Sequence, residues 1–519
     1  MLSRPRRAAG KVHTHVNEVD RAIAHAVSSL PPTRFDAAMK TVSAAANHSL
    51  LWFTVAALLA CRRGALRKAA LRGIAAIAGS SILANGVLKR LLPRRRPAAA
   101  ELPGYRTLSN PPTSSSFPSG HAASAAAFAA AVALESPRTG LAIAPLAAAV
   151  AYSRVHTGVH WASDVAAGAA VGAGVALATQ RWWPVRPTDE ARARPIDAAP
   201  ELPRGKGLVL ISNQRSGDPD ADPADEIEQA FPDAVVVRAV PDRDLDEQLD
   251  EAVAAHEDTV LAVGVAGGDG SVAAAAAVAG RRGLPLVVVP MGTLNHFARD
   301  VGVYDLQEAV DAGGAGQAVA VDLGLVDVHP PRGAGEPDAV VRTRVFINTA
   351  SLGSYPELVR LRERWQPRLG KWPAFALALA VVLRRSEPVR VCIDGRWQTV
   401  WFLFIGNNPY YPRGFVPAWR PSLDTGLLDA RWLRADVPFS RLRAVVGLAL
   451  GALGRSRVYV QREAPSFDVE LEVPGMLATD GEVVEESGRF TFRVAPEPIP
   501  VYRRDEDRWT GRDRPYLRA

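Results

Sequence analysis

Apolar and polar residues are distributed unevenly along this chain, and the change falls near residue 184. Alanine-rich apolar stretches crowd into roughly residues 45–180, whereas charged residues dominate from about residue 184 onward. The mean hydropathy of zero therefore averages two unlike halves. This contrast predicts a membrane domain followed by a soluble domain.

The first half contains apolar stretches that could cross, or nearly cross, a bilayer as helices. They cover about residues 45–61, 70–92, 121–135, 139–153 and 163–180. A crossing helix needs about 20 apolar residues, so the two shortest stretches are marginal. The pattern favours an all-α transmembrane helical bundle, and a soluble bundle with an alanine-rich core is the alternative. Residues 16–30 carry several charges, which fits an interfacial helix better than a span.

Basic residues after the first apolar stretch indicate how the chain crosses the membrane. The positive-inside rule places such residues in the cytoplasm, and here they are Arg62, Arg63, Arg67, Lys68 and Arg72. Alternation from that loop puts residues 89–96, 119–121 and 154–160 together on the opposite face. It returns residue 181 onward to the cytoplasm. The basic N-terminus would then lie outside, which disagrees with the same rule.

The second half alternates strand and helix patterns before it becomes mainly β. A proline- and charge-rich stretch at 184–206 is interpreted as an extended linker. Strands are predicted at 207–212, 235–240 and 260–265, with a helix at 244–255, which indicates an α/β sheet. A β-rich second lobe follows, with strands predicted at 389–393, 399–405, 466–473 and 490–494. The predicted divisions are 1–44 (basic, interfacial), 45–183 (membrane domain), 184–206 (linker), 207–320 and 321–500 (two lobes), and 501–519 (charged tail).

Charge and cysteine content exclude some classes of function. The chain has 519 residues, a net charge of +7 and a pI near 9.6. Its arginines cluster beside apolar stretches, which favours contact with anionic lipid over nucleic acid. Cys61 and Cys392 are too far apart in sequence to indicate a disulfide framework or a zinc cluster. No apolar run directly follows the basic residues at 4–7, so a cleaved signal peptide is not expected.

Three short motifs in the first half carry candidate phosphate chemistry. They are Lys89-x6-Arg96-Pro97, Pro118-Ser119-Gly120-His121 and Ser153-Arg154-x5-His160-x3-Asp164. In this order and spacing they resemble the type 2 phosphatidic acid phosphatase family, which is related to vanadium-dependent haloperoxidases. The resemblance covers about residues 45–180.

The resemblance implies a site that removes a phosphate through a histidine, without a cofactor. Phosphoryl oxygens need positive charge and hydrogen-bond donors, and the implied ligands are Lys89, Arg96, Ser119, Gly120 and Arg154. His160 would be the nucleophile and His121 the acid that protonates the leaving group. Asp164 would orient His160 from the same helix face. Arg90, Arg94 and Arg95 are interpreted as headgroup anchors, and His156 is given no role.

A second set of motifs lies in the soluble half. Gly267-Gly268-Asp269-Gly270-Ser271 follows a predicted strand, and Gly292-Thr293-Leu294-Asn295 and Asp480-Gly481-Glu482 come later. Glycines of this kind allow backbone amides to wrap phosphates. The set resembles the diacylglycerol kinase catalytic family, which includes sphingosine kinases and bacterial lipid kinases. This resemblance covers about residues 207–500.

The second resemblance implies ATP and Mg²⁺ as cofactors of a lipid kinase. The implied nucleotide ligands are Gly267, Gly268, Gly270, Ser271, Thr293 and Asn295. Asp269 would act near the transferred phosphoryl group or its magnesium, and Asp480 and Glu482 would complete the site, with a carboxylate accepting the proton of the lipid hydroxyl. Asp480 is also a candidate metal ligand. Asp424 and Asp429 resemble a structural magnesium segment of bacterial members, although such acids more often cap a turn.

Two residues depart from the pattern of the kinase family. Ala274 stands where a glutamate is common, and His296 stands where an aspartate is often found. A kinase-like domain that senses lipid or nucleotide without transferring phosphate therefore remains an alternative. A soluble haloperoxidase-like oxidant, which would require vanadate, is a third interpretation.

The leading hypothesis is a bifunctional enzyme of the cell membrane. Its phosphatase site would hydrolyse a lipid phosphate or diphosphate, such as phosphatidic acid or undecaprenyl diphosphate, on the outer face. Its kinase domain would phosphorylate a diacylglycerol-like lipid in the cytoplasm, where ATP is available. The expected partners are membrane lipids and ATP, without nucleic acid, and a homodimer is left open.

Overall fold

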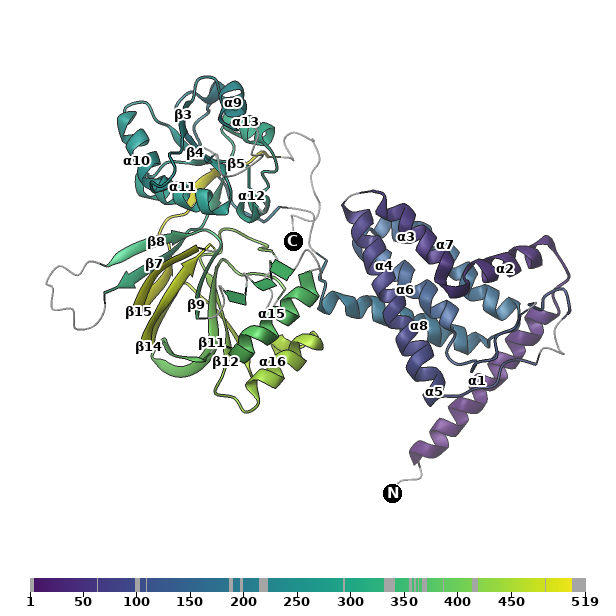
Figure 1. The fold of residues 1–519 in the computed structure, drawn as a ribbon. Coiled ribbons are helices and arrows are strands. Elements are labelled where there is room, and N and C mark those ends of the chain that lie inside the picture. Colours follow the sequence, from purple (N-terminus) through teal and green to yellow (C-terminus); the bar gives the residue numbers. More distant parts are fainter. Residues whose placement is uncertain are drawn as a thin grey trace. The chain divides into compact units, whose positions relative to one another are not determined.

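The computed structural model describes residues 4–62, 64–98, 103–108, 110–185, 190–196, 199–213, 223–292, 295–330, 341–353, 357–358, 361–362, 364–365, 371–385, 387–412, 419–480 and 482–505. The chain forms two compact units, Met1–Val185 and Arg186–Ala519. Their boundary falls close to residue 183, the predicted end of the membrane domain. The first unit consists of helices and the second contains sheets flanked by helices (Figure 1).

Every regular element described in the first unit is helical. In chain order these are α1 (Arg4–Ser28), α2 (Arg34–Ala45), η1 (Asn47–Ser49), α3 (Leu50–Ala60), α4 (Ala65–Ser81), the π-helical η2 (Ile82–Leu88), α5 (Lys89–Leu91), α6 (Gly120–Glu135), α7 (Pro137–His156), α8 (Ala162–Ala178) and η4 (Thr179–Arg181). Helix α6 is central, because it packs against α4, α7 and α8. Most of its buried residues are alanines, and small side chains let neighbouring helices approach closely.

Two glycines of α8 allow it to pack directly against α6. A Cβ atom on Gly168 would collide with the carbonyl oxygen of Ser119, and one on Gly172 with that of Ala123. Both glycines share a helix face with Asp164, because the three follow one another at intervals of four residues. This packing brings the start of α6 to Asp164, whose carbonyl oxygen accepts the Ser119 amide at 2.9 Å.

The predicted membrane spans are confirmed only in part. Among the described residues, two helices are long and apolar enough to cross a membrane, Ala65–Leu91 and Ala162–Arg181. The bent pair Arg34–Ala45 and Asn47–Ala60 would be a third span if the two helices cross together. The stretches predicted at 121–135 and 139–153 do form α6 and α7. Helix α6 has 16 residues, and it rises only about 24 Å against a hydrocarbon core of about 30 Å.

Arg72 does not belong to a free basic loop. It is fully buried in α4, where its Nε lies 2.7 Å from Glu135 Oε1 and its Nη1 donates to Thr179 Oγ1 at 2.8 Å. Its guanidinium also lies over the ring of Trp183. Arg72 is paired with Glu135, so it should not be counted among the basic loop residues from which the topology was predicted. Arg63 lies outside the described residues.

The N-terminal helices are tied to the bundle by buried acidic residues. The segment predicted to be interfacial, residues 16–30, falls largely in α1, which packs against α7 and α8. Asp36 of α2 is buried and lies 2.7 Å from Arg106 Nε and 2.8 Å from His156 Nε2. His156, which the sequence interpretation left without a role, therefore joins α7 to α2.

The second unit begins with a parallel sheet that confirms the predicted α/β lobe. Strands β2 (Leu208–Ser212), β3 (Val235–Arg238), β4 (Ala262–Gly267) and β5 (Leu286–Pro290) run parallel in the order β5-β4-β2-β3. The surrounding helices are α9 (Pro223–Ala230), α10 (Leu245–Ala255), α11 (Asp269–Arg282), α12 (His296–Val301) and α13 (Leu306–Gly314). The four strands are mostly valine, leucine, isoleucine and alanine, and β2 and β4 are buried throughout, as expected for a sheet covered on both faces.

The sheet of this first lobe also contains strands from outside the predicted range 207–320. Its other edge is built by β1 (Pro195–Ile196), β6 (Ala318–Val321) and β16 (Ile499–Tyr502), in the order β1-β6-β16-β5. The predicted linker is thus partly incorporated into this lobe, because β1 pairs with β6 and the Ala191 amide donates to the Asp300 carbonyl oxygen. The predicted tail contributes Val501 and Tyr502 to β16. The first sheet therefore contains strands from outside the predicted range 207–320.

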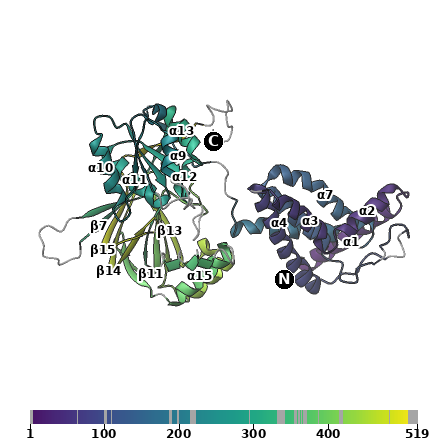
Figure 2. The same cartoon turned by 45° about the horizontal axis from the view of Figure 1, so that its top comes forward.

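The second lobe is a nine-stranded antiparallel sheet with helices packed against it, as predicted from its β pattern. Its strands are β7 (Gly324–His329), β8 (Arg342–Phe346), β9 (Thr349–Gly353), β10 (Val389–Ile393), β11 (Arg396–Asn407), β12 (Leu428–Arg434), β13 (Tyr459–Ala464), β14 (Ser466–Thr479) and β15 (Glu482–Val494). Helices α15 (Lys371–Arg385) and α16 (Ser440–Ala449) pack against each other near β11 and β12 (Figures 1 and 2).

Candidate functional sites

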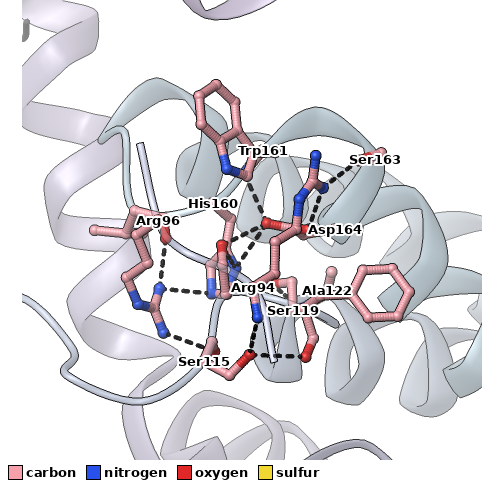
Figure 3. A network of polar contacts seen from close by, with 12 residues as sticks. Arg94, Arg96, Ser115, Ser119, Ala122, His160, Trp161, Ser163 and Asp164 are labelled. Atoms are coloured by element: carbon pink, nitrogen blue, oxygen red, sulfur yellow. Dashed lines mark hydrogen bonds and ion pairs between the residues drawn. The ribbon is translucent and has the colours of Figure 1, made fainter. Parts of the chain in front are cut away.

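His160 and Asp164 meet at the start of α8. His160 Nδ1 lies 3.7 Å from Asp164 Oδ2 and 3.4 Å from Ser116 Oγ, while its Nε2 lies 3.2 Å from Arg96 Nη1. Figure 3 shows His160 between Arg96 and Asp164. The predicted contact is present, but its predicted cause is wrong. His160 precedes the helix, and Asp164 turns back toward the loop as a capping residue that accepts the Trp161 amide at 3.0 Å.

Arg94 holds Asp164 from the opposite side, although the sequence interpretation made it a headgroup anchor. Its Nη1 lies 2.7 Å from Asp164 Oδ1 and 2.7 Å from Ser163 Oγ. Its Nη2 lies 2.8 Å from Asp20 Oδ2 in α1 (Figure 3 shows the Arg94 contacts to Asp164 and Ser163). Asp20 and Asp164 are both buried. One arginine therefore links α1 to the residue that faces the candidate nucleophile, a pairing with no local sequence signal.

The predicted cationic ligands line one cavity. It has a volume of about 590 Å³, and its polar wall includes Lys89, Arg96, His121, Arg154 and His160. The apolar part of the cavity lining comes from Phe53, Ile74, Ile77 and Ala78. The cavity therefore offers positive charge and a hydrocarbon surface to the same ligand.

Not every predicted phosphate ligand reaches this cavity. Gly120 borders it, but Ser119 is fully buried and its hydroxyl caps α6 by accepting the Ala122 amide at 3.5 Å. The Ser119 hydroxyl therefore caps a helix in this structure, and its contact with phosphate stays a prediction. Ser114 does border the cavity, with its Oγ 3.4 Å from Lys89 Nζ, and its carbonyl oxygen accepts Arg96 Nε at 2.9 Å.

The surroundings favour the neutral form of His160. Burial lowers its pKa to about 4, and the charges of Arg96 and Arg154 act in the same direction against the hydrogen bond to Asp164. A neutral imidazole keeps a lone pair on one ring nitrogen, as a nucleophile requires. His121, which also lines the cavity, has its Nε2 3.0 Å from Asn47 Oδ1.

The glycine loop of the second unit lies at the carboxyl edge of the parallel sheet. Gly267 ends β4, Gly268 precedes α11, and Gly270 and Ser271 lie in its first turn. A Cβ atom on Gly292 would come within 2.6 Å of Gly268 Cα, so the two predicted loops touch. The carboxyl edge of such a sheet, followed by a helix N-terminus, is where open α/β folds bind phosphates.

Asp269 connects the glycine loop to the next helix. Its two carboxylate oxygens accept the His296 amide at 3.0 Å and the Phe297 amide at 2.9 Å. The sequence interpretation missed this capping role, which leaves further acceptor capacity on the carboxylate. Asn295 precedes that helix, and its Oδ1 is buried without a hydrogen-bond partner among the described residues, which fits a donor group on a bound nucleotide. Thr293 lies outside the described residues.

Asp480 approaches from the second lobe. It lies in the turn between β14 and β15, and its carboxylate accepts the amides of Ile347, Asn348 and Thr349 at 2.8–2.9 Å. Burial raises its pKa to about 6 against these hydrogen bonds, and the negative charge of Asp269 contributes to the rise. The two predicted aspartates are thus close enough to interact. Glu482 begins β15, and its side chain lies outside the described set.

The predicted magnesium ligands Asp424 and Asp429 both have partners within the chain, and the magnesium site stays a prediction. Asp429 is buried against Arg431, with Oδ2 2.6 Å from Nη2, whereas its Oδ1 is buried without a hydrogen-bond partner among the described residues. Asp424 accepts the Arg194 amide and the Ser422 hydroxyl, each at 2.8 Å. Among the described residues, no group of three or more His, Cys, Asp or Glu side chains could hold a metal ion, and this includes Asp480.

Arg420 joins the two lobes of the second unit, and no sequence motif indicated it. This fully buried arginine lies 3.0 Å from Asp300 Oδ2 in α12 and 3.0 Å from Asn348 Oδ1, beside the amides that contact Asp480. It also donates to the Ile347 carbonyl oxygen at 2.6 Å. Arg420 therefore fixes the distance between the nucleotide loops and the Asp480 turn.

Comparisons with known families bear on both halves of the chain. The model of the PAP2 superfamily matches residues 69–187, and the model of the diacylglycerol kinase catalytic domain matches residues 207–326. The chain carries both domains. The first match contains all three phosphatase motifs completely, and the second contains both nucleotide loops.

Relatives of each domain are known separately. The chain is 26% identical over 306 residues, 58% of its own length and 95% of the relative, to the "Probable lipid kinase YegS-like" of Pseudomonas aeruginosa strain UCBPP-PA14. It is 42% identical over 105 residues to the lipid A 1-phosphatase of Rhizobium johnstonii, a match that covers 19% of this chain and 42% of that protein. A Bacillus anthracis diacylglycerol kinase structure aligns at TM-score 0.39 and 17% identity, over 58% of this chain and 98% of that one.

Together the domain matches support a lipid phosphatase and a lipid kinase on one chain. The kinase fold implies ATP-dependent phosphoryl transfer, for which Mg²⁺ is typical. The apolar helices and the PAP2 match indicate a membrane protein.

Proposed function

We propose that this chain removes phosphate from one membrane lipid and adds phosphate to another. The observation that carries the proposal is the cavity of the first unit, where cationic Lys89, Arg96 and Arg154 share one space with apolar Phe53 and Ile74. A lipid phosphate matches both surfaces, because it combines an anionic headgroup with a hydrocarbon chain. The proposed substrate is a lipid phosphate or diphosphate, such as phosphatidic acid or undecaprenyl diphosphate.

In the proposed hydrolysis, His160 is the nucleophile. A proton on Nδ1, facing Asp164, leaves the lone pair on Nε2 beside Arg96. Nε2 attacks phosphorus, a P–N bond forms and the P–O bond to the lipid breaks. Burial lowers the pKa of His121 to about 3, so His121 starts neutral, takes the proton of a monoanionic phosphate and passes it to the leaving oxygen. Water then cleaves the P–N bond and releases phosphate. The guanidinium of Arg96 stabilises the charge on the phosphoryl oxygens.

In the proposed kinase reaction, the amides around Gly268 and the start of α11 bind the ATP phosphates. Bound Mg²⁺ would neutralise phosphate charge, and Asp269 is the carboxylate nearest the glycine loop. Asp480, whose pKa is raised to about 6 by burial, suits the removal of a proton from a lipid hydroxyl near neutral pH. The proposed acceptor is a diacylglycerol-like lipid.

The competing proposal is a phosphatase with an inactive, kinase-like sensing domain, and Ala274 and His296 motivate it. An assay of full-length His160→Ala protein in diacylglycerol vesicles distinguishes the two proposals. This variant lacks the candidate nucleophile of the phosphatase, so it cannot remove a phosphate that the kinase domain adds. With γ-labelled ATP, we expect labelled lipid to accumulate. ATP binding without labelled lipid would support the sensing domain instead.

We also propose that the two sites face opposite sides of the membrane, so that the bilayer prevents a futile cycle. Thr113 and Asp258 are exposed residues of the first and second unit. In a Cys61→Ser background, Thr113→Cys should react with an impermeant maleimide in intact cells, and Asp258→Cys only after the membrane is opened. Labelling of both from the same side would refute the separation.

A further inference from the structure

Helix α16 presents large apolar side chains to the outside of the second unit. Phe439, Leu442 and Leu450 are 77%, 61% and 59% exposed, and Val445 and Val446 are 40% and 43% exposed. Folding usually buries the apolar face of a surface helix. A contiguous exposed patch of this kind therefore marks an interaction site.

The exposed residues form one stripe along the helix. Leu442 and Val446 lie four residues apart in α16 and so share one side, and Phe439 and Leu450 cap the two ends of the helix. The opposite side of α16 is already packed, because Ala444 and Leu448 belong to a core cluster with residues of α15. The stripe is thus a second apolar face that the unit leaves uncovered.

Basic residues border the stripe. Arg441 and Arg443 are exposed, and at 100° per residue they fall on either side of the apolar arc. From Val437 to Arg462 the sequence holds five arginines and no acidic residue. Arginines beside an exposed apolar stripe are the pattern of a helix that lies in the headgroup region of an anionic membrane.

We propose that α16 docks the second unit on an anionic lipid surface. The charge of its flanking arginines favours this occupant over a second copy of the chain, whose α16 would bring like charges together. The membrane is also always nearby, because the same chain carries helices able to span it, and such tethering raises the local concentration of the surface. Docking would bring the unit to lipid whether or not it transfers phosphate.

The test places a fluorophore on the stripe of the full-length protein. In a Cys61→Ser background, Leu442→Cys carries an environment-sensitive dye, and the protein is reconstituted in vesicles that contain nitroxide-labelled lipid. We expect a blue shift and quenching with phosphatidylglycerol present, and loss of both in phosphatidylcholine alone. Leu450→Cys, on the same stripe, should behave alike. The matched control is Asp258→Cys, exposed on the nucleotide lobe, which should show neither effect.

Three outcomes would overturn the proposal. Equal signals at residues 442 and 258 would mean that the stripe stays in water. Disulfide-linked dimers through Leu442→Cys without lipid quenching would identify a second copy as the occupant. A blue shift without nitroxide quenching, and of equal size with and without phosphatidylglycerol, would indicate that another part of this chain covers α16. Arg443→Gln should reduce the response to phosphatidylglycerol.

Discussion

The two candidate sites bind phosphate by different physical means. In the first unit, the phosphate would meet charged side chains, and Asp164 beside His160 is held by the half-buried Arg94, which also contacts the buried Asp20. In the second unit, it would meet backbone amides at a helix N-terminus, and the carboxylates of Asp269 and Asp480 are themselves held by backbone amides. The first site depends on ion pairs between distant helices, whereas the second depends on how closely two loops pack.

The largest difference between the two sites is expected when Arg94 is removed. Arg94→Ala should leave Asp164 buried without its ion-pair partner, and phosphate release should fall roughly 1,000-fold, as when an oriented donor is removed from an active site. Phosphate transfer should not change. Arg95→Ala is the matched control, since the neighbouring Arg95 side chain is exposed. If the variants at 94 and 95 had equal rates of release, Arg94 would be only a surface charge.

The second unit has its own buried arginine, which should affect stability more than chemistry. Arg420→Ala removes the buried ion pair with Asp300, which costs about 3–4 kcal/mol of unfolding free energy. The thermal unfolding of the second unit should move to lower temperature while phosphate release at 25 °C persists. Arg434→Ala removes an exposed pair with Asp436 and should cost less than about 1 kcal/mol. If Arg420→Ala destabilised the second unit by as little as Arg434→Ala, the role of Arg420 in joining the two lobes would be contradicted.

Loop contact can be tested with one methyl group. Gly292→Ala places a Cβ atom 2.6 Å from Gly268 Cα. The loops must separate, and misplacement by about 1 Å can reduce transfer up to about 100-fold. Gly314→Ala, where a Cβ atom meets nothing within 4 Å, should leave the transfer rate unchanged. Steady-state rates with both substrates saturating give the comparison, and normal transfer by the Gly292 variant would show that the loops need not touch.

The two activities should differ in their response to acid. The pKa of Asp480 is raised to about 6, so transfer should decline as pH falls through 6, because a protonated carboxyl cannot accept the hydroxyl proton. The pKa of His160 is lowered to about 4, so this nucleophile stays neutral and competent until pH falls through about 4. Profiles of kcat/KM against pH should therefore separate on their acid limbs. Coincident limbs would contradict these assignments.

The sequence predicted the residues that carry chemistry better than those that hold them. The phosphatase residues lie in short motifs with fixed spacing, so Lys89, Arg96 and His160 could be found without a structure. Arg94 and Asp20 could not, because their contact joins segments 74 residues apart and depends on how α1 packs. The helix-capping contact of Ser119 could not be predicted, because its place in a motif does not reveal whether its hydroxyl points to ligand or caps a helix.

In the second unit, strand positions were predicted well because buried strands have simple apolar patterns. β10 matches its predicted range at 389–393. The pairing of β1 and β16 with strands far away in sequence was not predicted, because such pairing has no local pattern. The contacts of the predicted magnesium ligands could not be read from their spacing for a related reason. Asp429 meets Arg431 only in the folded chain.

The central claim is that two independent sites act on phosphate within one chain. Its most direct test is to measure phosphate release and γ-phosphate transfer in the same preparations of wild type, His160→Ala and Asp269→Ala. We expect His160→Ala to lose release by about 10,000-fold or more, as for loss of a covalent nucleophile, and to keep transfer. Asp269→Ala should lose transfer and keep release. If either substitution lowered both activities together, two independent sites would be contradicted.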